Sequence, residues 1–269
     1  MARRPRRREA PPAERVQKLL ASAGHGSRRQ IEGWIEQGRL SLNGRPAQLG
    51  DRASGRDRIT LDGKPLRIRP RSSQPRVLIY HKPVGEICSR RDAEGRRTVF
   101  EALPPARGGR WVAIGRLDLN TSGLLLFTDD GALANRLAHP SNGFQREYRV
   151  RIAGQVDDDT MQRLRDGVTL DDGPARFEGF ERVGGEGVNQ WYSAVLGEGR
   201  NRLVRRMIES EDLQVSRLLR IRFGPVVLPR WLHRGQWAEA SPQVLQDLTG
   251  GPAPPVAPAT RRRPPPRRR

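Results

Sequence analysis

The sequence has little cysteine, little histidine, few aromatic residues and no long apolar run. A single cysteine, Cys88, among 269 residues excludes a disulfide within the chain. With no recognisable secretory leader, this predicts a cytoplasmic protein. No stretch approaches the roughly 18 consecutive apolar residues that a transmembrane helix needs. Disulfide-stabilised and membrane-spanning classes are therefore excluded.

Motifs for metals and nucleotide cofactors are also missing. The four histidines are His25, His81, His139 and His233. None of them has another histidine, a cysteine or a carboxylate at the spacing that metal ligands need. There is no GxxxxGKS/T motif and no GxGxxG motif after a strand. We therefore expect neither a metal nor an organic cofactor.

Positive charge is what the sequence has in excess. Fifty Lys and Arg residues against thirty Asp and Glu residues give a formal net charge of +20, which favours polyanions such as nucleic acid. Residues 1–10 hold five arginines and one glutamate, and residues 250–269 hold six arginines and no acid, so the two ends carry half of the net charge. Only three basic residues are lysines, and genomic base composition is an alternative explanation of this arginine excess.

Composition divides the chain into five segments. Both ends are rich in Pro and Arg, and a Pro- and Ser-containing stretch follows the first folded pattern, as is typical of disordered arms and linkers. We expect a disordered basic arm over 1–12, a small domain over 13–69, a linker over 70–75, a larger domain over 76–248 and a disordered tail over 249–269.

The first domain has the pattern of two helices followed by strands. Apolar residues at helical spacing predict a helix over about Val16–Ala23, and a second helix begins at the capping box of Ser27 and Gln30. Alternation predicts strands over Arg39–Leu42 and Arg58–Leu61, and each is followed by an Asn-Gly or Asp-Gly turn.

Two arginines in the first turn of the second helix point to an anion. Arg28 and Arg29 lie where the helix dipole disfavours cations, and a bound phosphate would reverse that effect. Two solvated arginines are the alternative. The segment ERVQKLLASAGHGSRRQIEGWIEQGRLSLNGRPAQLGD resembles the S4-type RNA-binding domain. The resemblance implies binding of structured RNA, with Arg28, Arg29, Arg39 and Asn43 on the contact face.

The second domain is expected to contain more strands than helices. The patterns predict strands over 77–80, 111–118, 124–128, 148–152, 191–196 and 218–223, and helices over 132–137, 160–166 and 201–209. Thr128 or Asp129 is the predicted cap of the first of these helices. Because the strands do not alternate regularly with helices, the predicted class is α+β with a mainly antiparallel sheet.

The strand predicted over 111–118 ends in two charged residues. A period of two places Arg116 and Asp118 on one face, just before the turn-forming sequence NTSG. A carboxylate held beside a positive charge stays ionised at neutral pH. The alternative is that Asp118 only opens the turn by bonding its own backbone.

Four segments of the second domain carry another resemblance. GRLDLNTSGLLLFTDDG, REYRVRI, EGRNRLVRRM and VSRLLRIRFG follow in the order and approximate spacing of bacterial ribosomal-RNA pseudouridine synthases that carry an S4-type domain, closest to the large-subunit type B group. The resemblance spans about residues 14–240. It implies an S4-like domain followed by a mixed-sheet pseudouridine synthase domain that uses no metal or organic cofactor.

The same resemblance implies catalytic roles for three residues. Asp118 matches the family's catalytic aspartate, which can attack the ribose or help to abstract a proton. Tyr148 matches the tyrosine that lies against the target base, and its alternative is packing in the core. Arg205 matches the arginine that pairs with the aspartate, and its alternative is a solvated position paired with Glu209.

Further substrate contacts follow from the motif matches. Val204 matches the apolar residue that lines the uracil pocket, and Arg116 is expected to contact RNA or to hold the opened nucleotide out of the stack. Lys82 and Arg200 are expected to contact phosphates. Leu203 stands where the family usually has Glu or Gln, which removes any hydrogen bond from that position.

The sequence therefore predicts an RNA-modifying isomerase that flips one uridine of 23S ribosomal RNA into a pocket and re-forms its base–sugar bond through carbon. One alternative is a noncatalytic RNA-binding factor in ribosome assembly, and another is the same reaction on 16S ribosomal RNA. The expected partner is ribosomal RNA or an assembly intermediate. With no coiled-coil pattern or exposed apolar repeat, the expected state is a monomer.

Overall fold

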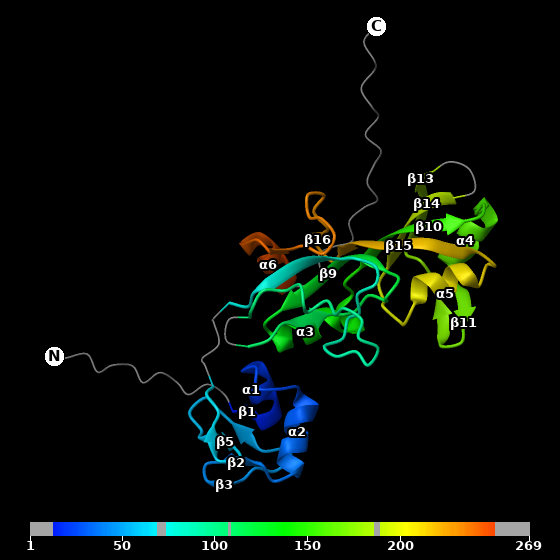
Figure 1. The fold of residues 1–269 in the computed structure, drawn as a ribbon. Helices are drawn as coiled ribbons and strands as arrows, with labels where there is room; N and C mark the ends of the chain where they lie inside the picture. Colours follow the sequence, from blue (N-terminus) through cyan, green and yellow to red (C-terminus); the bar gives the residue numbers. More distant parts are fainter. Residues whose placement is uncertain (1–12, 69–73, 107–108, 186–188, 251–269) are drawn as a thin grey trace, which may run out of the picture.

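The computed structural model describes residues 13–68, 74–106, 109–185 and 189–250. Figure 1 shows a small unit of N-terminal helices and strands and a larger unit built around a long sheet. The arm and tail predicted at the two ends, and most of the predicted linker, lie outside the described residues. Within the described ranges, no helix is long and apolar enough to cross a membrane.

The small unit packs two helices against short strands. The helices are α1 (Val16–Ser22) and α2 (Arg28–Glu36). One sheet contains, in spatial order, β3 (Arg45–Pro46), β2 (Leu40–Leu42), β5 (Ile59–Leu61) and β6 (Lys64–Pro65). A separate pair of strands consists of β1 (Glu14–Arg15) and β4 (Arg52–Ala53). Apolar side chains of both helices and of β2 and β5 form one buried core. The helix–helix–strand order predicted for this domain is confirmed.

Local signals fix the boundaries of these elements. The predicted capping box is present, because Ser27 Oγ accepts from the Gln30 N–H at 3.0 Å and Gln30 Oε1 accepts from the Ser27 N–H at 3.4 Å. Asn43 and Gly44 have φ of +52° and +89°, as a tight hairpin between β2 and β3 requires.

The larger unit is built on one mixed sheet in the order β13-β14-β10-β15-β9-β7-β17. Its strands are β13 (Gly179–Gly184), β14 (Asn189–Leu196), β10 (Arg146–Ala153), β15 (Gln214–Phe223), β9 (Ser122–Thr128), β7 (Val77–Lys82) and β17 (Trp237–Glu239), with β16 (Val226–Val227) beside β15 and β8 (Val112–Ile114) beside β9. Only β15 and β9 run parallel among the described strands. This confirms the predicted α+β class with a mainly antiparallel sheet.

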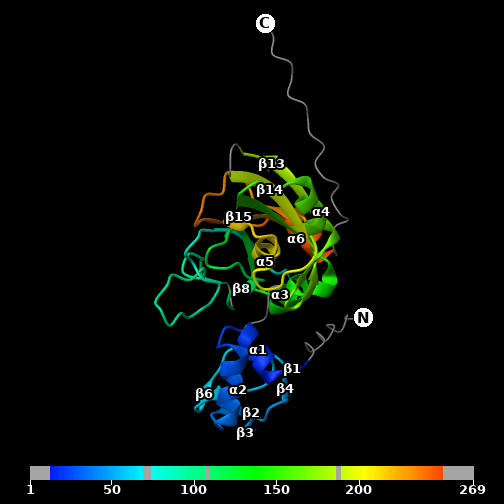
Figure 2. The ribbon, with the colours of Figure 1, turned by 90° about the vertical axis from the view of Figure 1, so that its right-hand side faces the viewer.

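Helices pack against this sheet through two apolar clusters. The helices are α3 (Gly131–Ala138), α4 (Asp158–Asp166), α5 (Leu203–Glu209) and α6 (Pro242–Thr249), with a 3₁₀ turn over Pro140–Asn142 and a small hairpin of β11 (Val168–Leu170) and β12 (Gly173–Ala175). Side chains of α4 and α5 bury against β10 and β14, and those of α3 and α6 bury against β7 and β9. Figure 2 shows α5 beside β15, viewed almost along the helix.

The structure corrects two of the predicted element boundaries. Asp130 caps α3, in place of Thr128 or Asp129, because its carboxylate accepts from the N–H groups of the first helical turn. The strand predicted over 111–118 ends at Ile114, where Gly115 has φ of +74°. Since Gly115 turns the backbone out of the extended conformation, Arg116 and Asp118 lie in a loop between β8 and β9 and do not share a strand face.

Candidate active site

A cavity of about 230 Å³ lies beside β10 and β15. The β8–β9 loop, the two strands, the connection after β14 and the start of α5 all contribute to its walls. It is smaller than the roughly 300–1,000 Å³ of pockets for larger organic ligands. It brings together five residues that the motifs singled out: Arg116, Asp118, Tyr148, Arg200 and Val204.

The loop that carries Asp118 is held from the end of β7 by Lys82. Lys82 is fully buried, and its Nζ donates to the backbone carbonyl oxygens of Asp118 at 3.0 Å and of Thr121 at 2.9 Å. Burial lowers the pKa of this ammonium. The phosphate contact predicted for Lys82 is therefore corrected, because the ammonium is enclosed by carbonyl oxygens and cannot reach RNA.

The side chain of Asp118 is half-buried and lines the cavity. The turn that follows it is closed by the Thr121 N–H, which donates to the Asp118 carbonyl oxygen at 3.0 Å. In the described part of the chain, the Asp118 carboxylate has neither a hydrogen bond nor an ion pair. The main chain of Asp118 thus builds the turn, while its carboxylate is available to a ligand.

Tyr148 lies on β10 between two regions of the core. Its ring packs against the cluster around Val150 and Tyr192 and also against the cluster around Tyr80 and Phe127. It is only half-buried and lines the same cavity as Asp118. Core packing and exposure to a ligand are therefore both present at this residue.

Arg205 lies in the first turn of α5 and is 8% exposed. Its guanidinium donates to the carbonyl oxygens of Asn120 at 3.0 Å and Val215 at 3.1 Å. The alternative of a solvated arginine paired with Glu209 is therefore wrong. Because Asn120 follows Asp118 by two residues, this arginine attaches α5 to the loop that carries the carboxylate.

Arg205 and Asp118 are within electrostatic range but do not form an ion pair among the described residues. Burial lowers the pKa of Arg205, and the charge of Asp118 raises it. The direct pairing predicted for these two side chains is thus absent from this arrangement. The arginine positions the loop through its backbone and adds positive charge near the carboxylate.

Comparisons with known proteins show which family of proteins this chain belongs to. A model of the RNA pseudouridylate synthase family matches residues 76–210, and a model of the S4 domain matches residues 14–66. Ribosomal large subunit pseudouridine synthase B of Yersinia pestis is 57% identical over 84% of this chain and 72% of its own length. The chain belongs to the RNA pseudouridylate synthase family.

Other comparisons agree with this membership. Ribosomal large subunit pseudouridine synthase B of Escherichia coli K12 is 56% identical over 84% of this chain and 79% of its own length. A crystal structure of a pseudouridylate synthase matches with a TM-score of 0.61 and 25% identity, covering 87% of this chain and 99% of that one. The resemblance inferred from the motifs is confirmed, and the chain is an enzyme with an S4 domain before its synthase domain.

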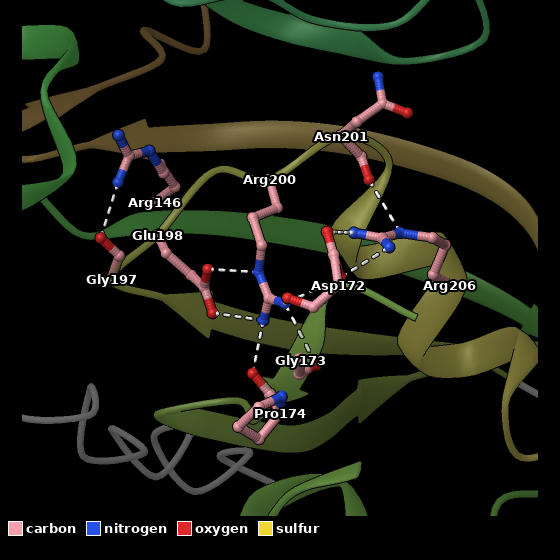
Figure 3. A network of polar contacts seen from close by, with 9 residues as sticks. All are labelled: Arg146, Asp172, Gly173, Pro174, Gly197, Glu198, Arg200, Asn201 and Arg206. Atoms are coloured by element: carbon pink, nitrogen blue, oxygen red, sulfur yellow. Dashed lines mark hydrogen bonds and ion pairs between the residues drawn. The ribbon is translucent and has the colours of Figure 1, made fainter. Parts of the chain in front are cut away.

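Arg200 has a structural role at the edge of the synthase cavity (Figure 3). Its guanidinium pairs with Glu198 at 2.7 Å and Asp172 at 2.9 Å, and it also donates to the carbonyl oxygens of Gly173 and Pro174. These contacts attach the loop before α5 to the β11–β12 hairpin. Because its donors are already used, the geometry argues against the phosphate contact predicted for Arg200.

The S4 domain presents its predicted RNA contacts in two ways. Arg28 and Arg29 are exposed at the start of α2 and line a second cavity together with Arg110 of the synthase domain. Burial lowers the pKa of Arg110, and so does the charge of Arg28. This cavity wall is therefore positively charged and open to solvent.

The other two predicted contacts in the S4 domain hold its turns. Arg39 forms two hydrogen bonds with Asp62, at 2.9 and 2.6 Å. Asn43 donates to Asp57 at 2.9 Å and accepts from the Arg58 N–H at 2.9 Å. Both side chains are exposed but already have partners within the domain, so they are weaker candidates for RNA contact than the arginines of α2.

Sequence reasoning missed two arginines of the synthase cavity. Arg146 and Arg220 are 6% and 3% exposed and both line it. Arg146 precedes Tyr148 by two residues on β10, but the strand predicted over 148–152 began too late to include it, although the same alternation extends to it. Arg220 lies on β15, directly opposite Tyr148 of β10. A register shift between Glu147 and Tyr148 is not visible in the sequence and concealed that pairing.

Proposed function

We propose that this enzyme converts one specific uridine of 23S ribosomal RNA into pseudouridine. The relatives that are 56–57% identical over most of the chain are named as large-subunit enzymes. The observation that carries the proposal is one cavity lined both by Asp118, whose carboxylate is unpaired among the described residues, and by Tyr148. Binding RNA alone requires no carboxylate there, because a carboxylate repels the phosphate backbone.

Substrate capture requires the target base to leave its stack. Extruding a nucleotide costs a few kcal/mol, and stacking on an aromatic ring returns about 1–3 kcal/mol per base. Tyr148 supplies that ring on one wall of the cavity, and Val204 supplies an apolar contact. Arg116 is exposed beside the cavity, where it contacts RNA or fills the place of the extruded nucleotide.

The chemistry then proceeds at the Asp118 carboxylate. It attacks C1′ of the ribose or removes a proton from the sugar as the C1′–N1 bond breaks. The freed uracil rotates and its C5 bonds C1′, while the Asp118–C1′ bond breaks or the abstracted proton returns to the sugar. The C5 proton then leaves and N1 gains a proton. Arg205 keeps the carboxylate aimed at the cavity by holding Asn120. No metal or organic cofactor takes part in this scheme.

The S4 domain supplies affinity for folded RNA in this proposal. Its exposed Arg28 and Arg29 lie at a helix N-terminus, where free N–H groups and guanidinium groups can converge on one phosphate. The substrate is 23S ribosomal RNA or a ribosome-assembly intermediate, and we expect the enzyme to act as a monomer in the cytoplasm.

The decisive experiment compares pseudouridine maps of ribosomal RNA from cells with and without this gene. We expect one modified position of 23S RNA to be lost in the deletion strain and restored by the wild-type chain. If the lost pseudouridine lay in 16S RNA instead, the substrate would be the small-subunit RNA. No change in either RNA would favour the noncatalytic assembly factor.

Asp118→Asn tests the assignment of the reacting carboxylate in the same strain. Its amide cannot act as a nucleophile or a base, so we expect no pseudouridine at the mapped position and RNA affinity close to wild type. Asp247→Asn is a suitable control, because Asp247 is exposed on α6 and lies outside the cavity lining. Pseudouridine formation by Asp118→Asn would remove this residue from the reaction.

A further inference from the structure

Arg146 and Arg220 are two buried cations in the wall of the synthase cavity. The Arg146 guanidinium donates to the carbonyl oxygens of Phe144 and Gly197, both at 2.8 Å. Arg220 Nε donates to the carbonyl oxygen of Leu124 at 2.8 Å. Neither arginine forms an ion pair with a carboxylate in the described part of the chain, so the direct partners of both guanidinium groups are neutral carbonyl oxygens.

Neutral partners do not compensate for burying two positive charges. Both guanidinium carbons lie near the ring of Phe223, at 5.3 Å for Arg146 and 5.5 Å for Arg220. Cation–π contacts contribute about 0.5–2 kcal/mol, whereas removing an ion from water costs several kcal/mol. Burial lowers the pKa of Arg146, and the charge of Arg220 lowers it further, whereas the charges of Tyr148 and Glu198 raise it. The carboxylates that line this cavity, Asp118 and Glu198, form no ion pair with either arginine among the described residues, so the wall keeps positive charge that a ligand can use.

Unused hydrogen-bonding atoms lie at the same wall. Arg220 Nη2 is shielded from solvent and has no hydrogen-bond partner among the described residues, and the same holds for Thr121 Oγ1. Both residues line the cavity. Buried polar atoms are nearly always hydrogen-bonded in folded proteins, so two such atoms at one cavity indicate a ligand with oxygen acceptors.

The position of Arg220 indicates which part of the RNA substrate supplies these oxygen acceptors. Arg220 is the cross-strand neighbour of Tyr148, the ring against which the proposed function stacks the target base. An arginine that is 3% exposed lies at the inner wall of the cavity. The phosphates stay with the RNA backbone outside, so the group that reaches this wall is the uracil ring with its two carbonyl oxygens.

We infer that Arg220, with Arg146 beside it, binds a carbonyl oxygen of the flipped uracil and stabilises the negative charge of the ring while it is detached from the ribose. This inference rests on the proposed function. When the C1′–N1 bond breaks, its electron pair stays on uracil and is shared by N1 and the carbonyl oxygens. C1′ either bonds an Asp118 oxygen or loses the neighbouring sugar proton to it. When C5 bonds C1′, the new bond uses the electron pair of the anion, and either the Asp118–C1′ bond breaks or the sugar carbon regains its proton from Asp118. The ring is then neutral, and it exchanges its C5 proton for one at N1.

Preorganised donors at a developing negative charge have large effects on rate. Removing one such donor costs about 10²–10³-fold in turnover in well-studied enzymes. Arg220→Met keeps much of the apolar stem but removes the guanidinium. We therefore expect its single-turnover rate, measured at saturating RNA, to fall by about 10²–10³-fold, while its dissociation constant for RNA changes less than threefold.

A change of leaving group separates charge stabilisation from loss of structure. The probe is a short synthetic RNA of the mapped region carrying uridine or 5-fluorouridine at the target. Fluorine withdraws electrons and stabilises the uracil anion, so a better leaving group needs less help from the enzyme. We expect the rate of substrate consumption by Arg220→Met to fall at least tenfold less with 5-fluorouridine than with uridine.

Two further variants complete the test. Arg217→Met removes the same charge from an exposed position of β15 and should keep the wild-type rate at saturating RNA. Arg220→Lys keeps a cation and is expected to fold and to show an intermediate rate with the same dependence on the leaving group. If Arg220→Met melts below wild type, Arg220→Lys decides the question.

The outcomes distinguish this inference from the proposed function. Three results for Arg220→Met would overturn the role of Arg220: equal rate losses on the uridine and 5-fluorouridine RNAs, an unchanged rate, or weaker RNA binding with an unchanged rate. In each case the activity of the wild-type enzyme would still support the proposed function. A wild-type enzyme that forms no pseudouridine would overturn the proposed function, and this inference with it.

Discussion

Lys82 holds the loop of Asp118 through backbone carbonyl oxygens alone. Its ammonium donates to the carbonyl groups of Pro83, Asp118, Leu119 and Thr121, at 2.9–3.4 Å. The lysine is fully buried, so removing it takes away the donor that these carbonyl oxygens share. The loop conformation that aims the carboxylate into the cavity therefore depends on a side chain that never contacts the substrate.

Lys82→Met should lower both stability and activity. The methionine fills most of the buried space but leaves carbonyl groups unsatisfied, which costs about 1–3 kcal/mol per group. Because the substitution also removes the desolvation cost of a buried charge, we expect the free energy of unfolding in urea to fall by about 1–3 kcal/mol in total, and kcat to fall more than the affinity for RNA. Lys64→Met, at an exposed position of β6, is the control. Wild-type kcat in Lys82→Met would show that the loop keeps its conformation without the lysine.

Motifs located the reacting residues better than their partners. GRLD and REY identified Asp118 and Tyr148, which do line one cavity. Residue type alone assigned Lys82 to phosphate, because a sequence does not show that carbonyl oxygens surround a side chain. Arg146 and Arg220 were missed because their burial depends on how β10 and β15 pair, including the shift in register beside Tyr148.

Gly123 allows β9 to approach β15 closely beside the active-site loop. Its φ is +109°, and a Cβ at this position would lie 2.2 Å from the carbonyl oxygen of Arg220 and 2.7 Å from its backbone nitrogen. Real Cβ atoms do not approach backbone atoms this closely. The parallel pairing of Gly123 with Arg220 therefore requires glycine, and the same pairing sets the place of Arg220 in the cavity.

Gly123→Ala should destabilise the protein more than the same substitution at a matched glycine. Gly173 has nearly the same φ, +108°, but no atom lies within 4 Å of its added Cβ. Both variants carry the backbone strain of a positive φ, but only Gly123→Ala adds a steric clash. We therefore expect the free energy of unfolding of Gly123→Ala to fall by about 1–3 kcal/mol more than that of Gly173→Ala. Urea unfolding of the two variants measures the difference. Equal losses would mean that β9 and β15 separate at little cost.

Elements with strong local signals were predictable. The apolar run at 124–128 identified β9 (Ser122–Thr128), and the capping box identified α2. The β11–β12 hairpin and α6 (Pro242–Thr249) were not predicted; β11 and β12 are three residues long each, too short to show a period. The strand predicted to Asp118 was too long, because alternation continued in sequence past Gly115 while the backbone turned there.

Net charge acts on the molecule as a whole, beyond any single contact. The chain carries +20, and six arginines lie in residues 250–269. Within the described residues, many arginines are already paired with carboxylates, as Arg39 is with Asp62 and Arg206 with Asp172. Free positive charge is therefore concentrated at fewer positions than the composition suggests, including Arg28 and Arg29, which the structure leaves exposed.

RNA affinity should depend steeply on salt and on the C-terminal arginines. Each phosphate contact releases counterions, so the logarithm of the association constant falls by about 0.7–0.9 per contact for each tenfold rise in salt. We expect deletion of residues 250–269 to weaken binding to ribosomal RNA and to make that slope shallower, while kcat at saturating RNA is unchanged. Filter binding from low to high potassium chloride measures both slopes. An unchanged slope after the deletion would show that these arginines do not contact phosphate, and the folded domains would then supply the electrostatic affinity alone.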